Sequence, residues 1–131
     1  MPSEYKNIVL DLIKLWIEFE NKKVIKYKEE FKGDFIYSFC CYSEFVYLIE
    51  YKIKELQRIA NIIEEEEFTL DETINLLKQY VETYEKDLLE GSVNKSSTNE
   101  LVNIGFLWEK KAKQELRKMC IELLSKEKNL N

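Results

Sequence analysis

Apolar residues between Phe35 and Ile63 recur at alternating intervals of four and three residues without a miss. An α-helix turns once every 3.6 residues, so this spacing places all of them along one stripe of a single helix. The stripe consists of Phe35, Phe39, Tyr42, Val46, Ile49, Ile53, Leu56, Ala60 and Ile63. The pattern predicts a helix over residues 34–64, capped by Asp34, with the whole stripe in a hydrophobic core.

Breaks at Lys32-Gly33-Asp34, at the run Glu64–Glu67 and around Gly91 divide the rest of the chain into three further segments. The first of them predicts a helix over residues 3–31. Its expected core stripe is Tyr5, Ile8, Leu12, Leu15, Trp16 and Phe19. Because the stripe weakens after Phe19, a kink or break near Asn21 stays open, as does an extended stretch over residues 24–28.

The two C-terminal segments predict helices over residues 69–90 and 97–126. Each begins with a capping box, Thr69 with Glu72 and Ser97 with Glu100, and Gly91 stands where a C-terminal cap belongs. Their expected core stripes are Leu70, Ile74, Leu77, Val81, Tyr84 and Leu88, and then Leu101, Gly105, Trp108, Ala112, Leu116, Met119 and Leu123. The small residues Gly105 and Ala112 indicate a close approach of another helix.

Four amphipathic segments joined by short turns are typical of a helical bundle. The chain has 131 residues, which fits one domain with its own core. We therefore expect an all-α fold, a single-domain antiparallel four-helix bundle over residues 1–131.

The sequence contains no histidine, which excludes Ser-His-Asp and Cys-His catalysis and histidine-based metal sites. Its three cysteines, Cys40, Cys41 and Cys120, have no metal-binding or redox spacing, and we expect Cys40 and Cys41 to fill space in the core. We therefore expect no catalytic residue, no metal and no cofactor.

No stretch reaches the about 18 uncharged apolar residues that a membrane span needs. The least charged run, residues 35–51, contains Glu44, and we interpret it as a buried helix. Unpaired cysteines fit a reducing compartment. A cytoplasmic protein without membrane contact is expected.

Charge is segregated along the chain. Residues 34–91 hold 14 acids and 5 bases, a net charge of −9, whereas the flanking segments together carry +4. Two interpretations stay open. The acidic middle hairpin either pairs with its basic neighbours inside the bundle, or it faces a basic partner with residues that include Glu64, Glu65, Glu66 and Glu67.

A second candidate surface lies on the back of the 34–64 helix, where a solvated face would carry Lys and Glu. It is instead rich in tyrosine, and its residues are Tyr37, Glu44, Tyr47, Leu48 and Tyr51. Either this helix is central and buried on both sides, or the back is a recognition surface. Self-association through it is a further possibility.

These features favour a non-enzymatic protein-binding module, most specifically an immunity or antitoxin-like inhibitor that occludes a basic toxin or nuclease. The alternative is a subunit of a nucleoprotein assembly. That subunit would hold a nucleic-acid backbone through the basic patch Lys110, Lys111, Lys113, Arg117 and Lys118. Only two arginines and a net charge of −5 make nucleic acid the weaker of the two hypotheses.

Overall fold

Four helices account for almost all of the part of the chain that the structure, a computed structural model, describes: residues 2–65, 69–94 and 99–127. The helices are α1 (Pro2–Gly33), α2 (Phe35–Glu65), α3 (Leu70–Asn94) and α4 (Glu100–Ser125). These described residues contain no strand. The prediction of an all-helical chain with four helices is confirmed.

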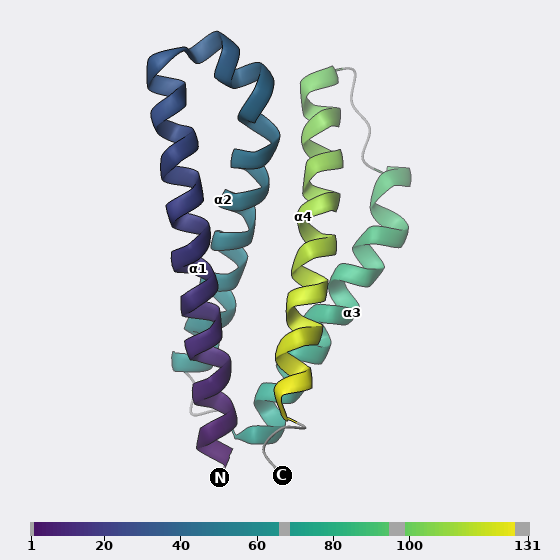
Figure 1. Cartoon of the computed structure of the whole chain (residues 1–131). Coiled ribbons are helices and arrows are strands. Elements are labelled where there is room, and N and C mark those ends of the chain that lie inside the picture. Colours follow the sequence, from purple (N-terminus) through teal and green to yellow (C-terminus); the bar gives the residue numbers. More distant parts are fainter. Residues whose placement is uncertain (1, 66–68, 95–98, 128–131) are drawn as a thin grey trace.

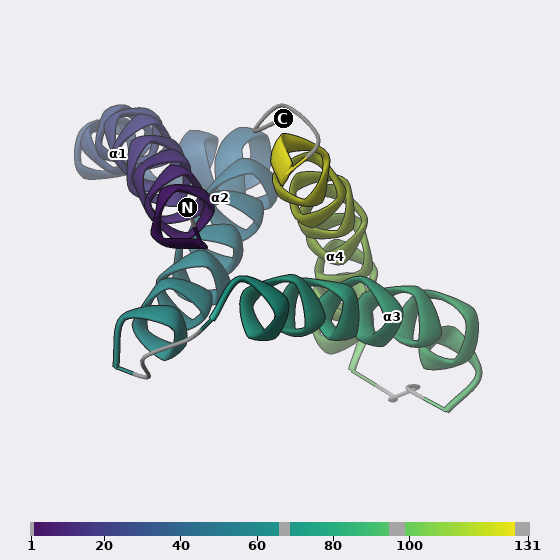
Figure 2. The same cartoon turned by 90° about the horizontal axis from the view of Figure 1, so that it is seen from below.

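The helices form two hairpins, α1 with α2 and α3 with α4, which meet mainly where α2 lies against α4. Successive helices run in opposite directions in Figure 1, and Figure 2 shows α3 inclined to the other three. As a consequence, α2 and α4 point the same way. Their N-terminal halves both lie at the end of the molecule opposite the chain termini (Figure 1).

Two of the predicted helix caps are confirmed. The Asp34 Oδ1 atom accepts a hydrogen bond of 3.1 Å from the Tyr37 amide at the start of α2. At the start of α3, the Thr69 hydroxyl oxygen accepts a bond of 3.2 Å from the Glu72 amide. Both side chains satisfy amides that have no carbonyl partner within the first helical turn.

The start of α4 differs from the prediction. Asn99, and not Ser97, precedes the first helical residue, and its Oδ1 atom accepts from the amides of Leu101 and Val102 at 2.9 and 3.3 Å. Ser97 lies outside the described residues. Asparagine is among the best N-cap residues, so the start shifts by three residues without loss of capping.

The predicted first helix is present as one element: α1 continues through Asn21 and through residues 24–28, so the extended alternative is wrong. One further helix boundary differs. The helix α3 passes Gly91 and continues to Asn94, although the sequence predicts its end at residue 90. Glycine costs a helix interior only about 1 kcal/mol, which the rest of a long helix can absorb.

The hydrophobic core fills the end of the molecule that holds the two termini. All four helices contribute to it: Tyr5, Val9, Leu10, Ile13, Leu56, Ile59, Ala60, Ile63, Leu77, Tyr84, Leu116, Cys120 and Leu123. The Tyr5 hydroxyl donates a hydrogen bond of 2.8 Å to the Leu123 carbonyl oxygen. This buried bond links the beginning of α1 to the end of α4.

Part of the predicted core is exposed. In α1, Leu15 and Phe19 face solvent, whereas Tyr5 is buried as predicted. The other buried positions described in α1 are Val9, Leu10, Ile13, Glu20 and Val24. The predicted stripe is displaced by about one residue because it treated Glu20 as a solvent position. Lys52 of α2 pairs with Glu20 and makes its burial tolerable.

The N-terminal halves of α2 and α4 also depart from the predicted core. Phe35, Phe39 and Leu101 are exposed, so residues 35–51 do not form the fully buried helix that was expected. A Cβ atom at Gly105 would meet nothing within 4 Å, and the predicted close helix approach is therefore absent there. The Phe31 ring of α1 lies 5.9 Å from the Phe35 ring, yet Phe35 stays 62% exposed, so α1 covers this position only in part.

Candidate interaction surface

The contact between α2 and α4, here called the seam, begins with two aromatic rings and an ion pair. The ring centroids of Tyr47 and Trp108 lie 5.8 Å apart, and the Lys111 ammonium lies 2.6 Å from a Glu44 carboxylate oxygen. Tyr51 donates a hydrogen bond of 3.3 Å to Glu109 one turn further along. The seam therefore joins the two hairpins with polar contacts as much as with apolar ones.

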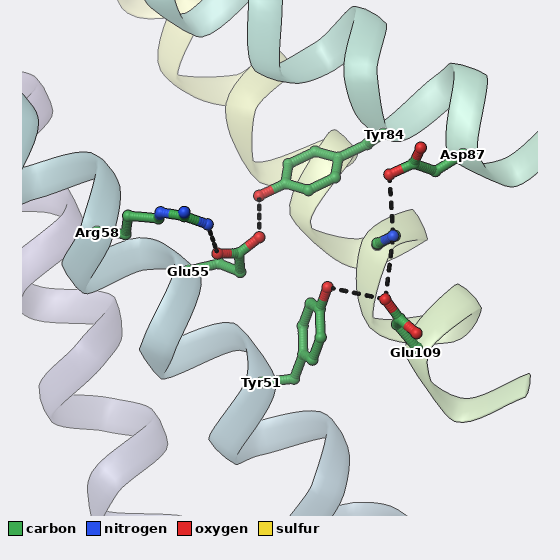
Figure 3. A network of polar contacts seen from close by, with 7 residues as sticks. Tyr51, Glu55, Arg58, Tyr84, Asp87 and Glu109 are labelled. Carbon is green, nitrogen blue, oxygen red and sulfur yellow. Dashed lines mark hydrogen bonds and ion pairs between the residues drawn. The ribbon is translucent and has the colours of Figure 1, made fainter. Parts of the chain in front are cut away.

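Figure 3 shows how α3 enters the seam through a polar network. Lys113 lies 2.9 Å from an Asp87 oxygen of α3 and 3.1 Å from a Glu109 oxygen of its own helix. On the other side, the Tyr84 hydroxyl donates a bond of 3.4 Å to Glu55, which also accepts an ion pair from Arg58 at 3.5 Å (Figure 3).

Burial and neighbouring carboxylates change the acid–base behaviour of these groups. Burial raises the pKa of Tyr51 and of Tyr84 above the ordinary tyrosine value, reinforced by Glu109 and Glu55 for Tyr51 and by Glu55 for Tyr84. For Lys113, burial acts to lower the pKa, but the hydrogen bonds to Asp87 and Glu109 outweigh it and raise the pKa. All of these groups thus keep the protonation state in which they donate hydrogen bonds.

A second polar cluster lies where α1, α2 and α4 meet. The Lys52 ammonium lies 3.3 Å from a Glu20 oxygen and 3.5 Å from a Glu115 oxygen, and the Lys52 and Glu20 side chains are only 10% and 8% exposed. The second carboxylate oxygen of Glu20 is buried without a hydrogen-bond partner. Sequence analysis missed both residues, although each stands at a helical core position between apolar neighbours.

Five of the 14 acids in residues 34–91 pair with bases of the flanking segments. These five ion pairs connect an acid of α2 or α3 with a base of α1 or α4, at distances between 2.6 and 3.2 Å. They are Lys14–Glu64, Lys28–Glu50, Lys111–Glu44, Lys113–Asp87 and Arg117–Glu85. Of the two interpretations of the −9 hairpin, this arrangement favours internal complementarity.

The predicted acidic and tyrosine-rich surface does not come together as one patch. Glu44, Tyr47 and Tyr51 lie in the seam, and Leu48 is half-buried beside them. Glu64 pairs with Lys14, and Glu65 is exposed at the opposite end of α2. Glu66 and Glu67 lie outside the described residues. Of the predicted surface residues in the N-terminal half of α2, only Tyr37 is exposed.

The basic patch is likewise mostly occupied. Lys111, Lys113 and Arg117 each hold a carboxylate of another helix. Within the described residues, Lys110 and Lys118 form no ion pair, and they are the two bases of the patch that remain available to a phosphate.

The most prominent exposed surface is one that sequence analysis did not assign. Residues 35–43 and 101–108 contain no charged side chain, in a sequence of which 34% is charged. Their large exposed side chains, which we call the uncharged end, are Phe35, Ile36, Tyr37, Phe39, Leu101, Val102, Ile104 and Leu107. Ile36 is 78% exposed and Phe35 62%. The two charge-free runs are visible in the sequence, and they are the feature from which this surface could have been predicted.

The uncharged end exists because α2 and α4 do not pack against each other above the seam. Tyr37 and Cys40 precede Glu44 and Tyr47 on the same side of α2 by the helical repeat, yet both are exposed. The two hairpins therefore separate beyond Tyr47 and Trp108 and leave apolar side chains on both helices uncovered. An exposed apolar surface of this size is typical of a binding surface.

The cysteines divide in the same way. Cys40 and Cys41 are exposed, so the expectation that they fill space in the core is wrong. Cys120 is buried, and burial together with the Glu55 charge raises its pKa to about 12. Cys40 and Cys41 are exposed because α2 and α4 separate in this part of the molecule. The side of α2 that carries the two cysteines therefore has no neighbouring α4 residues against it.

Within residues 2–65, 69–94 and 99–127, no three acidic or cysteine side chains come close enough to hold a metal ion. None of the four helices combines the length and the apolar character of a membrane span in its described part. A comparison with protein-family models, curated proteins and solved structures finds no match to this chain.

Proposed function

We propose that this chain is a non-catalytic protein-binding module that contacts its partner through the uncharged end. The single observation that carries the proposal is the exposure of eight large apolar side chains on two charge-free helix segments at one end of the molecule. Interfaces bury such residues at their centre, with charged residues confined to the rim. Most monomeric proteins keep comparable side chains inside.

In its most specific form, the module is a cytoplasmic immunity or antitoxin-like inhibitor that occludes a basic toxin or nuclease domain. The net charge of −5 would accelerate the approach of such a partner at long range, and the uncharged end would make the contact that holds it. In this form the chain acts as one antiparallel four-helix bundle, in which the seam connects the two hairpins.

This division of labour can be tested by kinetics. Reversing the charge at Glu64 and Glu65 should slow association and weaken its dependence on salt, because both carboxylates act through the solvent at long range. Introducing a charge at Ile36 should instead accelerate dissociation. An association rate that ignores the Glu64 and Glu65 reversal would remove the charge-based argument for a basic partner.

The contact surface itself is tested by affinity purification from the native cytoplasm, followed by mass spectrometry. Wild-type protein is compared with Ile36→Glu and with Leu15→Glu, since Leu15 is 59% exposed on α1 away from the uncharged end. A partner that Leu15→Glu retains and Ile36→Glu loses supports the proposal. A partner retained by both variants places the contact elsewhere.

The nucleoprotein alternative gains no support from the geometry, because three of its five bases already hold carboxylates. It predicts backbone binding that falls steeply as salt rises. Gel shifts at low salt decide it: a shift that disappears in Lys110→Glu/Lys118→Glu would restore the alternative.

A further inference from the structure

We propose that the uncharged end is covered by the same end of a second copy of this chain, in a symmetric dimer. The inference rests on the proposed function, because it names the partner of the same surface. Three properties of the uncharged end carry it: its helical spacing, its area and its lack of charge.

The spacing of the exposed apolar residues on α2 favours another helix as the occupant. Phe35 and Phe39 continue the alternation of four and three residues that Ile49, Leu56 and Ile63 follow inside the core. In the buried half of α2, this stripe packs against neighbouring helices. In the exposed half, Tyr27 and Phe31 of α1 contact Tyr42 and Phe35 of the stripe, but Phe35 and Phe39 remain 62% and 45% exposed. A further helix with matching spacing is the element that fits these uncovered positions. A second copy of α2 has that spacing by identity.

The area fits a dimer. An aromatic side chain covers about 150–250 Å² and an aliphatic one somewhat less, so eight of them at about half exposure present on the order of 700 Å². Because consecutive residues point to different sides of a helix, this total is an upper value for the patch, against the roughly 300–600 Å² of the largest apolar patch on a typical monomer. It approaches the about 800 Å² that each partner contributes to a stable interface.

The charges fit a second copy better than a highly charged partner. A two-fold symmetric contact places the same patch against itself, so any charge at its centre would face its own duplicate. Residues 35–43 and 101–108 contain none, and the flanking residues carry both signs, with Lys32 near Asp34 in one hairpin. The contact therefore meets no like-charge repulsion at its centre.

A lipid surface is the competing occupant, and the charged residues around the α1–α2 turn disfavour it. Glu29, Glu30 and Asp34 surround this turn, which lies at the extreme end of the molecule (Figure 1). Lys26, Lys28 and Lys32 in the same segment balance these carboxylates, so headgroup charge does not decide the point, but inserting so many charged groups among the acyl chains would be costly. The apolar side chains of α4 also extend along its side, as a helix partner requires.

Sedimentation velocity of the full chain over about a hundredfold range of concentration tests the proposal. The key variant is Ile36→Glu/Leu101→Glu, which adds an acid to the first turn of α2 and of α4, where negative charge favours the helix. Its fold should therefore persist, which circular dichroism verifies. Leu15→Glu is the matched control, with a similarly exposed leucine in the other half of the molecule.

At high concentration, wild-type protein and Leu15→Glu should show the sedimentation coefficient of a dimer, which corresponds to twice the mass of the chain. In Ile36→Glu/Leu101→Glu the dissociation constant should rise by about 100-fold or more, leaving a folded monomer. A wild-type monomer throughout overturns the inference, as does a dimer that the double variant leaves intact. Flotation of wild type, but not of the double variant, with anionic vesicles would also overturn it, by assigning the surface to lipid.

The outcome separates the inference from the proposed function. If the chain is monomeric and a different protein binds wild type but not Ile36→Glu, the second copy is refuted and the proposed function stands. If the chain is monomeric and no protein depends on Ile36, both fail.

Discussion

Tyr47 of α2 and Trp108 of α4 face each other with ring centroids 5.8 Å apart, and beyond them the two helices part. Below this pair, toward the chain termini, lie the polar network, the buried ion pair and the core. Above it, the same two helices expose charge-free apolar side chains. The pair marks the boundary between the half of the molecule that holds the buried core and the half in which large apolar side chains are exposed.

Removing one ring of this pair should weaken the joint between the hairpins. Because Trp108 is half-buried, Trp108→Ala should lower the free energy of unfolding by about 2 kcal/mol, below the range for a fully buried tryptophan. Urea denaturation followed by circular dichroism measures it. Phe19→Ala, which truncates an exposed ring on α1, should cost less than about 0.5 kcal/mol. Equal losses in both variants would show that the ring pair is not a joint.

The Glu20–Lys52 pair makes a different prediction, since both side chains are nearly buried. Lys52→Met alone leaves a buried carboxylate uncompensated and should destabilise the protein by about 3–5 kcal/mol. Glu20→Leu combined with Lys52→Met removes both charges and should recover most of that loss. Denaturation of the two single variants and the double variant completes the cycle. A double variant as unstable as the sum of the singles would contradict the pairing.

Alkaline pH should destabilise the fold. Burial raises the pKa of Cys120 from 9.0 to about 12 and that of Tyr5 from 10.0 to about 12, so the folded state holds both protons longer than the unfolded state does. Their contribution to stability is complete below about pH 9 and is lost as the pH rises toward 12. The expected slope is up to about 1.4 kcal/mol per pH unit for each group.

Thermal unfolding between pH 8 and 11.5 checks this prediction. In Tyr5→Phe the slope between pH 10 and 11.5 should be shallower than in wild type, although the lost bond to Leu123 lowers stability at every pH. Tyr27→Phe is the control, because Tyr27 is only half-buried and lies outside both the core and the uncharged end. A wild-type stability that does not change over this range would contradict the assigned burial of both groups.

The ion pair between Glu44 and Lys111 tests whether the acidic hairpin is neutralised internally. Glu44→Lys places two ammonium groups together and should destabilise the protein by about 0.5–1 kcal/mol at low salt. The exchange Glu44→Lys/Lys111→Glu should restore stability. If binding to a partner falls in Glu44→Lys and stays low in the exchanged variant, Glu44 belongs to a binding surface after all.

The number of helices, the caps at Asp34 and Thr69, and the C-terminal half of the α2 stripe could be predicted from the sequence, because they depend on local hydrogen bonds and on helical spacing. The stripe of α1 could not. Its register depends on whether Glu20 is buried, and that is decided by Lys52 on another helix. If every charged residue is assumed to be solvated, the helical spacing predicts that Leu15 and Phe19 are buried. In the structure both are exposed.

The candidate surface was harder to predict for a related reason. The spacing of Phe35 and Phe39 correctly indicates side chains that favour burial, but it does not say which chain buries them. The assumption that every apolar stripe is buried within the chain placed these exposed side chains in a predicted core. Conversely, Tyr47, Tyr51 and Glu44 were predicted as surface residues because a sequence does not reveal which helix lies behind α2.

Whether a second copy of the chain covers the uncharged end can be measured by hydroxyl-radical footprinting with mass spectrometry. The measurement is made on wild-type protein at low and at high concentration. We predict that modification of Phe35, Ile36, Phe39 and Leu101 falls several-fold at high concentration, while Leu15 and Phe19 remain equally reactive at both. If the uncharged end is modified as fast at high concentration as at low, a second copy does not cover it, and the account of the molecule as one half of a shared core is contradicted.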